Sequence, residues 1–579
     1  MRPRRTRLMG AVLAAAALAL SILPATAADA GESYVPISGA GSSWSSVAIQ
    51  QWAVNVQQYG MKVRYASTGS SDGRNQFKAG TVDFAVSEIP YGIKDGGVTD
   101  VPPTVGYAYM PIVAGGTSFM YNLSAGGKQI TNLRLSGPVL AGIFTGKITS
   151  WDDPKVKADN PGLDLPKRRV VPVVRSDGSG STAQFTTWMS KKYPSEWNAY
   201  CKQAGRPLPC GITSNYPTVA GKGFIAQPNS QGVSGYVAQK ANVGTITYVE
   251  YSYALKTGYP VAKVLNKAGY YVEPTASNVA VGLLGAKINQ DKRSSSYLTQ
   301  ILDGVYDNPD ARTYPLSSYS YMVVPTTTDA SLTPAKGKTL GAFDYYFLCE
   351  GQQQAEVLGY SPLPINLVQA GLDQVRRIPG VEAKKIDIRK CNNPTFSADG
   401  KNTLAVKAPQ PPACDKLGAT QCNTGTGGAK GTTTPTQSGG ASSGGAGGSG
   451  GGTGAAGGSG SGSGGSGTGA KGGGSGGSGS GGSGGSGSGS GSGSTELSGG
   501  STGSGGTGAV PALNNGSPVQ CDADSGVCQN VAALPVEVDA ADGWTPTRTL
   551  MLCAVAALLG VVLLPPLIGV LVSRRRTQK

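Results

Sequence analysis

Residues 170–185, VVPVVRSDGSGSTAQF, are the starting point for predicting the fold. Four valines among the first five residues predict a short buried strand, and Gly178 and Gly180 mark a tight turn. A helix follows, and its amino end offers three capping hydroxyls, on Ser179, Ser181 and Thr182. The amino end of a helix carries unpaired N–H groups and roughly half a positive charge. Arg175 adds a full charge just before the turn, so this stretch is a candidate anion-binding loop.

Strand-like and helix-like segments alternate on both sides of this stretch. The apolar spacing predicts strands at 61–67 and 82–87, and helices at 45–59, 136–144, 181–191, 276–289, 340–357 and 365–377. Such alternation is typical of an α/β architecture. About 350 residues exceed one comfortable hydrophobic core, so two lobes are expected.

Both ends of the chain carry membrane signals. Several arginines within the first seven residues, an apolar run and small residues near 25–30 predict a secretory signal peptide over residues 1–30. Residues 549–572 are almost uninterruptedly apolar, which is long enough for one helix to cross a bilayer about 30 Å thick. Three arginines then predict that residues 573–579 are cytoplasmic and that the head is extracellular.

Composition divides the part between these ends. A globular head is expected over residues 31–400, followed by a Cys-containing tail over 401–422. A disordered Gly/Ser-rich linker is expected over 423–509 and a juxtamembrane segment over 510–548. Within the head, lobe 1 is expected over about 34–117 and 258–390, and lobe 2 over about 118–257. The layout is a binding head on a flexible tether with a membrane anchor.

Nine cysteines and a secretion signal fit an oxidising compartment. Three pairs are close in sequence, Cys201/Cys210, Cys414/Cys422 and Cys521/Cys528. Cys349 and Cys391 are then left to pair at longer range, with Cys553 inside the apolar span, although spacing alone does not fix the connectivity. None of the spacings is typical of a zinc site, and the chain has no histidine.

Several functional classes are disfavoured. The segment 69–73 matches a G-x-S-x-G nucleophile motif, but without histidine a Ser-His-Asp triad cannot form. The segment 142–147, GIFTGK, is one residue too short for a phosphate-binding P-loop. The net charge of +15 comes from scattered basic residues without an aromatic-interleaved patch, so no nucleic-acid partner is expected. We expect neither an enzyme nor a cofactor.

Three Gly/Ser turns precede predicted helices, at 39–44, 68–73 and 175–182. Each offers hydroxyl and N–H donors, and any one of them is explained by ordinary helix capping. Three in one head are better explained by convergence on an anion.

A set of motifs then occurs in a recognisable order. They are GAGSSW at 39–44, VDFAVSEIP at 82–90, IFTGKITSWDDP at 143–154, NPG at 160–162, RSDGSGST at 175–182 and ITYVEYSYAL at 246–255. Together they resemble the phosphate-binding proteins of ABC phosphate importers (PstS), over roughly residues 35–380. The resemblance implies the type II periplasmic-binding-protein fold, in which two α/β lobes joined by a hinge close on phosphate.

The resemblance also implies a ligand set, carried over motif by motif. The expected phosphate-binding residues are Ser43, Trp44, Ser70, Glu88, Arg175, Ser179, Gly180 and Ser181, with Asp177 orienting Arg175. The sequence departs from the family pattern at four places: Trp44 replaces Phe, Glu88 replaces Asp, Ser181 replaces Thr, and the segment 228–233 is altered.

Glu88 bears on selectivity. Monohydrogen phosphate has a proton to donate, whereas sulfate at neutral pH has none, so an ionised acceptor in a dry cleft favours phosphate. The expected function is capture of inorganic phosphate at the cell surface for an ABC permease. The alternatives are a surface sensor, an adhesin or a receptor for another oxyanion on the same fold, and, with less support, a secreted phosphatase-like enzyme.

Overall fold

The computed structural model describes residues 34–436, except 96, 292, 295, 330, 331, 389, 390 and 397–400, and also the backbone of 520, 521, 528 and 529. The chain forms two compact units, Met1–Gly450 and Gly451–Lys579. In the second unit, β18 (Gln520–Cys521) pairs antiparallel with β19 (Cys528–Gln529). The predicted signal peptide, the spanning segment and the Cys521/Cys528 disulfide lie outside the described residues and side chains.

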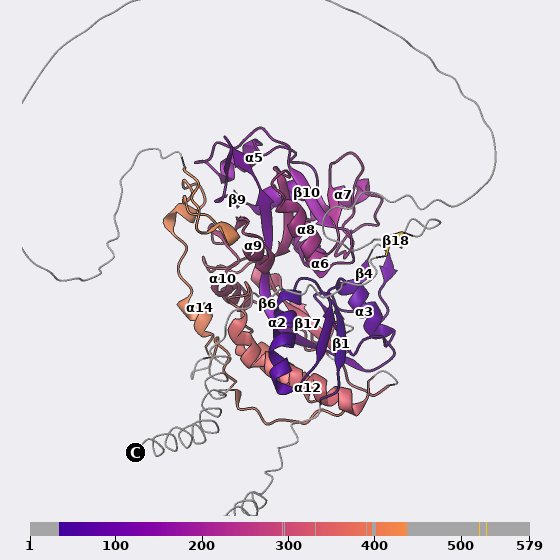
Figure 1. Ribbon diagram of the computed structural model, residues 1–579. Coiled ribbons are helices and arrows are strands. Elements are labelled where there is room, and N and C mark those ends of the chain that lie inside the picture. The colour runs from indigo at the N-terminus through magenta and orange to yellow at the C-terminus, as the bar shows by residue number, and fades with distance from the viewer. Residues whose placement is uncertain are drawn as a thin grey trace, which may run out of the picture. The chain divides into compact units, whose positions relative to one another are not determined.

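One mixed sheet runs through the first unit, in the order β11-β10-β12-β6-β17-β3-β1-β2. Its centre is the long strand β6 (Tyr107–Asn122), which belongs to both lobes. Up to Gly116, β6 pairs antiparallel with β17 (Ser317–Pro325), and from Thr117 onward it pairs antiparallel with β12 (Thr245–Glu250). Figure 1 shows this central region between an upper group with α5 to α8 and a lower group with α2, α3 and α12. The two-lobed α/β architecture is therefore as expected.

Lobe 1 is built around three parallel strands, β1 (Ile37–Gly41), β2 (Val63–Ala66) and β3 (Phe84–Ser87), joined to β17 and β6. Its helices are α2 (Ser46–Asn55), η1 (Val56–Tyr59), α3 (Ser70–Lys78), α10 (Ala276–Leu283), α11 (Asp303–Tyr306), α12 (Pro334–Leu348), η2 (Glu350–Gln354) and α13 (Ile365–Val375). Two short hairpins extend from it, β4 (Lys94–Asp95) with β5 (Val98–Thr99), and β15 (Lys287–Ile288) with β16 (Gln300–Ile301).

Lobe 2 is built around β10 (Val171–Arg175), which runs parallel to both β11 (Ile225–Gln227) and β12. Its helices are α4 (Gly137–Phe144), α5 (Pro154–Asp159), α6 (Gly180–Lys192), α7 (Pro194–Gln203), α8 (Asn229–Val237) and α9 (Tyr251–Thr257). The remaining strands are β7 (Ser124–Ala125), β8 (Lys128–Gln129), β9 (Arg134–Leu135), β13 (Val261–Leu265) and β14 (Tyr271–Val272). The packing of α4 and α6 on the sheet is aromatic, because the rings of Phe119, Phe144, Phe185 and Tyr248 contact one another.

Most predicted elements are present, including the strand and helix of residues 170–185. The helix expected at 276–289 ends at Leu283, and Gly285 just beyond it approaches the backbone of Gly304 too closely for a side chain. The helix expected at 340–357 instead begins at Pro334, where the Thr333 hydroxyl caps the Lys336 N–H.

The lobe boundary predicted at residue 258 is displaced. β13 pairs with β6 at Met120 and with β9 at Arg134, so this strand lies in lobe 2 and not in lobe 1. Residues up to Val272 follow it, because β14 pairs with β13. The apolar residues of β13 predict a strand but not the strand with which it pairs, because that pairing depends on the tertiary structure.

The chain also returns to lobe 2 near the end of the first unit, over residues 413–436, here called the C-terminal strap. The Arg134 guanidinium is fully buried and donates to the carbonyl oxygens of Cys414 and Ala419, at 2.9 and 2.8 Å. The Thr426 hydroxyl donates to the Val261 carbonyl at 2.5 Å. The sequence predicts that the Gly/Ser-rich linker starts at residue 423, whereas Thr426 and Thr434 within residues 423–436 bond to lobe 2.

Three predicted disulfides are confirmed, Cys201–Cys210, Cys349–Cys391 and Cys414–Cys422. The last one closes the loop that supplies an acceptor to Arg134, so it stabilises the strap on lobe 2. Within the part of the chain that the structure describes, no helix is long and apolar enough to cross a membrane. The expected span at 549–572 is outside that part.

Truncation tests the strap. A chain that ends at residue 412 should unfold with a free energy lower by about 3 kcal/mol or more than a chain that ends at 436, because buried Arg134 loses two of its three acceptors, the carbonyls of Cys414 and Ala419. Urea denaturation measures the difference. A chain that ends at 450 is the control and should match the chain that ends at 436. Equal midpoints for the chains ending at 412 and 436 would show that the strap adds no stability.

Candidate functional site

The amino ends of four helices meet where the two lobes face each other. α2 and α3 come from lobe 1, and α6 and α8 come from lobe 2 (Figure 1). The Ser43 hydroxyl, just before α2, lies 2.9 Å from that of Ser230 in the first turn of α8. The Ser70 hydroxyl, at the start of α3, accepts from the Gly180 N–H at the start of α6 at 3.1 Å. Each helix end contributes partial positive charge, so this junction favours an anion.

Arg175 supplies the full positive charge at this junction. Its side chain is 2% exposed and forms a two-point ion pair with Asp177, in which Nε lies 2.7 Å from Oδ1. Nη1 points elsewhere, toward the Ser230 hydroxyl at 3.4 Å. Asp177 also accepts from the Asn229 N–H at 2.9 Å, which anchors α8 to the same group. Asp177 thus binds two nitrogens of the Arg175 guanidinium and leaves the edge with Nη1 for the cleft.

Glu88 lies opposite, at the end of β3, and is fully buried. Its Oε1 accepts from the Ser42 hydroxyl at 2.6 Å and from the Ser320 hydroxyl, and its Oε2 accepts from the Ser70 hydroxyl at 2.9 Å. A carboxylate has about four acceptor positions. Three hydroxyl donors therefore hold Glu88 in place and leave one acceptor position for a further donor.

Glycine at position 180 is a steric requirement of this arrangement. A Cβ there would lie 1.8 Å from Glu88 Oε2 and 2.6 Å from the Ser70 hydroxyl oxygen. Gly69 meets a second requirement, because its φ of 102° is in the region that favours glycine and a Cβ would lie 2.6 Å from Asp177. Both glycines allow the two lobes to approach within hydrogen-bonding distance.

Two hydroxyls and an indole at the junction have no hydrogen-bond partner among the described residues, although all three are buried: Ser45, Ser181 and Trp44. A buried polar group without a partner costs free energy, so Ser181 and Ser45 are suited to donate to a ligand. The Trp44 ring instead packs edge-on against Tyr360, and its backbone N–H donates to Ser42. The structure therefore places the Trp44 side chain beside the junction rather than in it.

Apart from the Trp44 side chain, the predicted residues lie at this junction. Ser179 caps α6 by accepting from the Thr182 N–H at 3.2 Å, while Gly180 and Ser181 form the first turn. Sequence reasoning missed Ser42, Ser230 and Ser320. Ser42 and Ser230 lie within segments that the motifs had marked, at 39–44 and 228–233. Ser320 comes from the middle of β17, where nothing in the sequence distinguishes it from other buried strand residues.

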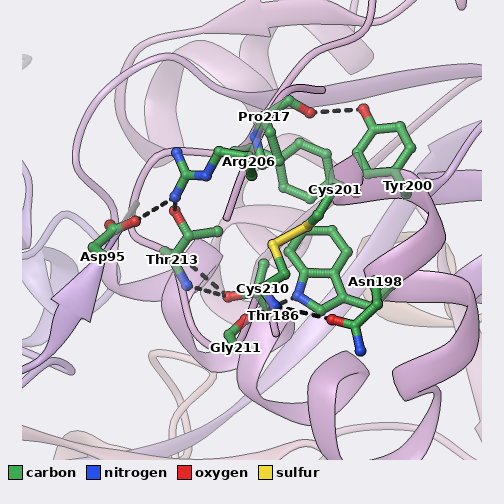
Figure 2. Close-up of a disulfide and its surroundings, with 12 residues drawn as sticks. Asp95, Thr186, Asn198, Tyr200, Cys201, Arg206, Cys210, Gly211, Thr213 and Pro217 are labelled. Carbon is green, nitrogen blue, oxygen red and sulfur yellow. Dashed lines mark hydrogen bonds and ion pairs between the residues drawn. A yellow bond between two sulfur atoms is a disulfide. The ribbon is translucent and has the colours of Figure 1, made fainter. Parts of the chain in front are cut away.

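A second set of contacts joins the lobes at the β4–β5 hairpin (Figure 2). Asp95 in this hairpin accepts from Arg206 at 2.5 Å and from the Ser214 N–H at 2.7 Å, both in lobe 2. The Cys201–Cys210 disulfide holds the loop that carries Arg206. Burial alone would raise the pKa of Asp95, but the hydrogen bonds from Thr213, Ser214 and Arg206 outweigh burial and hold this pKa below its ordinary value.

The described residues contain no group of three or more His, Cys, Asp or Glu side chains that is arranged to hold a metal ion. The full charges that the described residues bring to the junction are those of Arg175, Asp177 and Glu88, and neutral hydroxyl and N–H donors surround them. The junction is therefore suited to bind an anion that also carries a proton.

Comparison with known proteins identifies the family. The model of the PBP superfamily domain matches residues 24–350. Phosphate-binding protein PstS of Xylella fastidiosa strain Temecula1 is 34% identical over 342 residues, which cover 58% of this chain and 83% of that protein. PstS of Methanocaldococcus jannaschii is 31% identical over 359 residues, which cover 58% of this chain and 85% of that protein. The chain belongs to the PstS family.

The PstS relatives are named as binding proteins, so the family is one of binding proteins and not of enzymes. The chain has the type II periplasmic-binding-protein fold that the motifs implied, with two α/β lobes. A solved phosphate-binding protein from Stenotrophomonas maltophilia is 18% identical, with a TM-score of 0.44, and the match covers 64% of this chain and 99% of that one.

The Asp95 contact gives a test of closure. Asp95→Asn should speed hydrogen exchange of the Ser214 amide by about tenfold, because the amide loses its charged acceptor and the hairpin its ion pair. In the unsubstituted protein, the lowered pKa means that ionised Asp95 favours closure. This contribution is fully present above about pH 4 and is lost as the pH falls through the lowered pKa.

Asp291→Asn, an exposed position in lobe 1, is the matched control and should leave exchange at Ser214 unchanged. Unaltered exchange in Asp95→Asn would show that the hairpin does not hold the lobes together.

Proposed function

We propose that this protein captures inorganic phosphate outside the membrane and delivers it to an ABC-type permease. The observation that supports this most is the buried Arg175 guanidinium, which faces the meeting point of four helix amino ends. The PstS relatives, named for phosphate binding, support the choice of anion. The proposed donors are Ser43, Arg175, Ser179 and Ser181, with the backbone N–H groups of Ser70 and Gly180, and the proposed acceptor is Glu88. The Ser70 hydroxyl donates to Glu88 and the Trp44 N–H donates to Ser42, so neither of these is a proposed donor.

Charge balance supports a dianion with one proton. The positive ends of α2, α3, α6 and α8 and the cleft-facing edge of Arg175 offset the charge of the anion, while neutral hydroxyls complete its shell. Glu88 accepts three hydroxyl protons and can take one more, from the P–O–H group of monohydrogen phosphate. Fully deprotonated sulfate has no proton to offer, and its oxygen would face a buried carboxylate.

The surrounding chain is proposed to hold this head at the membrane. The predicted signal peptide directs it outside, the predicted helix at 549–572 anchors it, and the Gly/Ser-rich stretch between is a tether. If that tether begins after residue 436, about 70 residues remain up to 509, with an r.m.s. reach of roughly 45–50 Å. This length lets the head move between solution and a permease in the same membrane.

Arg175→Ala should raise the Kd for phosphate at least about a hundredfold, because the full positive charge that the described residues supply to the junction is removed. Titration calorimetry measures this. Arg312→Ala is the matched control, since Arg312 forms a similar two-point pair with Asp310 outside the junction. Undiminished affinity in Arg175→Ala, with the fold intact by circular dichroism, would exclude this site.

Glu88→Gln tests selectivity. An amide is uncharged, so we expect the preference for phosphate over sulfate to fall by about tenfold or more, mostly through tighter sulfate binding. The measurement is the ratio of the two Kd values at pH 7. Glu350→Gln, on the exposed surface, should keep the ratio of the unsubstituted protein. An unchanged ratio in Glu88→Gln would assign selectivity to other residues.

A further inference from the structure

A group of basic side chains lies at the amino edge of the lobe 2 sheet. It consists of Lys147, Lys157, Lys167, Arg168, Arg169 and Lys222, here called the basic edge. Lys167 to Arg169 lead directly into β10, and Lys222 precedes β11. The other two follow α4 and lie within α5.

Local packing brings these residues together. The Arg169 guanidinium lies against Gly223, the neighbour of Lys222, and the Lys222 side chain lies over Gly146, the neighbour of Lys147. The Trp151 N–H bonds to the Arg168 carbonyl, which brings the segment before α5 beside the start of β10. The basic edge is therefore one surface, although its members come from four separate places in the chain: after α4, within α5, before β10 and before β11.

The charges on this surface are not neutralised by ion pairs. Within the described residues, none of the six forms a salt bridge. The nearby carboxylates are engaged locally, since Asp152 accepts from the Ser150 hydroxyl and Asp153 caps the Lys155 N–H. Asp164 is exposed, and six basic residues outnumber these three acidic ones. The surface as a whole stays positive.

Two further contacts of the basic edge involve only neutral groups. Arg168 Nη1 donates to the Val243 carbonyl at 3.3 Å, and Lys222 Nζ donates to the Thr145 carbonyl at 3.5 Å. The Ser150 hydrogen bond, followed by the charges of Lys157 and Lys167, lowers the pKa of Asp152, which places both lysines near it. The cations are therefore held close to one another, and the one carboxylate that two of them act on, Asp152, forms no salt bridge with either.

The basic edge faces away from the anion site. β10, β11 and β12 are parallel, so their amino ends share one edge and their carboxyl ends the other. Arg169 precedes β10 and Arg175 ends it, so the two are roughly 20 Å apart along the strand. Figure 1 shows α5 at the far end of lobe 2 from the lower lobe. A ligand at this edge neither enters nor blocks the junction of the four helices.

We propose that the basic edge binds a linear polyanion that bears phosphate groups. A group of cations without ion-pair partners on one surface matches the many charges of a polyanion, and the forked guanidinium groups of Arg168 and Arg169 match phosphate oxygens. The choice of a polymer over an anionic membrane rests on the proposed function. A membrane bound at this edge would hold the cleft away from a permease in that membrane, whereas a polymer on the outer side leaves the cleft free.

Binding of long-chain inorganic polyphosphate to the full chain tests this, with the cleft kept saturated by inorganic phosphate. We expect the logarithm of the affinity to fall linearly with the logarithm of salt concentration, as for other phosphate polymers. The combined change Lys157→Gln, Lys167→Gln and Arg168→Gln should weaken binding at least about tenfold and reduce the slope by about two to three. Tripolyphosphate, which carries far fewer charges, should bind more weakly.

The matched control changes three exposed lysines elsewhere, Lys62→Gln, Lys267→Gln and Lys287→Gln, and should retain affinity and slope. Equal loss in both triple variants would overturn the proposal, since it would reflect net charge alone. Absence of polyphosphate binding, or stronger binding to phosphatidylglycerol vesicles, would also overturn it. Arg175→Ala should bind polyphosphate normally, so failure of the proposed phosphate site is distinguished from failure of the basic edge.

Discussion

The strand β6 is the constraint on which the rest of the head depends. Lobe 1 pairs with this strand up to Gly116, and lobe 2 pairs with it from Thr117 onward, so one strand belongs to both half-sheets. Because each lobe is fixed to the same strand, the carboxyl ends of β1 and β3 and those of β10 and β12 face a common space. The anion junction forms there.

The fold keeps Arg175 and Glu88, the cation and the buried acid on opposite sides of the junction, from pairing with each other. Arg175 is paired to Asp177 within lobe 2, and Glu88 is held by three hydroxyls of lobe 1. The lobes then meet through neutral groups, Ser43 with Ser230 and Ser70 with Gly180. Neutral contacts between hydroxyls and N–H groups exchange readily with a ligand that offers oxygen atoms. A direct ion pair between Arg175 and Glu88 would compete with that ligand much more strongly.

The C-terminal strap changes how the tether is understood. From α13 in lobe 1 the chain passes α14 (Thr403–Lys407), which packs on α10, and then continues to lobe 2, where Arg134 and Thr426 hold it. The chain thus crosses between the lobes once more before the strap, in addition to the crossings in β6 and between β14 and α10. Its composition, rich in Gly and Thr, resembles the linker that follows, but threonine hydroxyls bond to backbone groups of residues 131 and 261. Composition alone therefore does not distinguish threonines that pack in the strap from threonines in the linker.

Local sequence pattern was enough to predict the alternating α/β elements, three disulfide pairs, the anion-binding turn at 175–182 and, through its motifs, the family. These features depend on apolar spacing, turn residues and short-range order, all of which can be read along the chain. The partner of β13, the position of the strap and the hydroxyls that hold Glu88 depend instead on long-range packing. Ser320 illustrates the reason: it is 232 positions from Glu88, and only the pairing of β17 with β3 and β6 brings the two together.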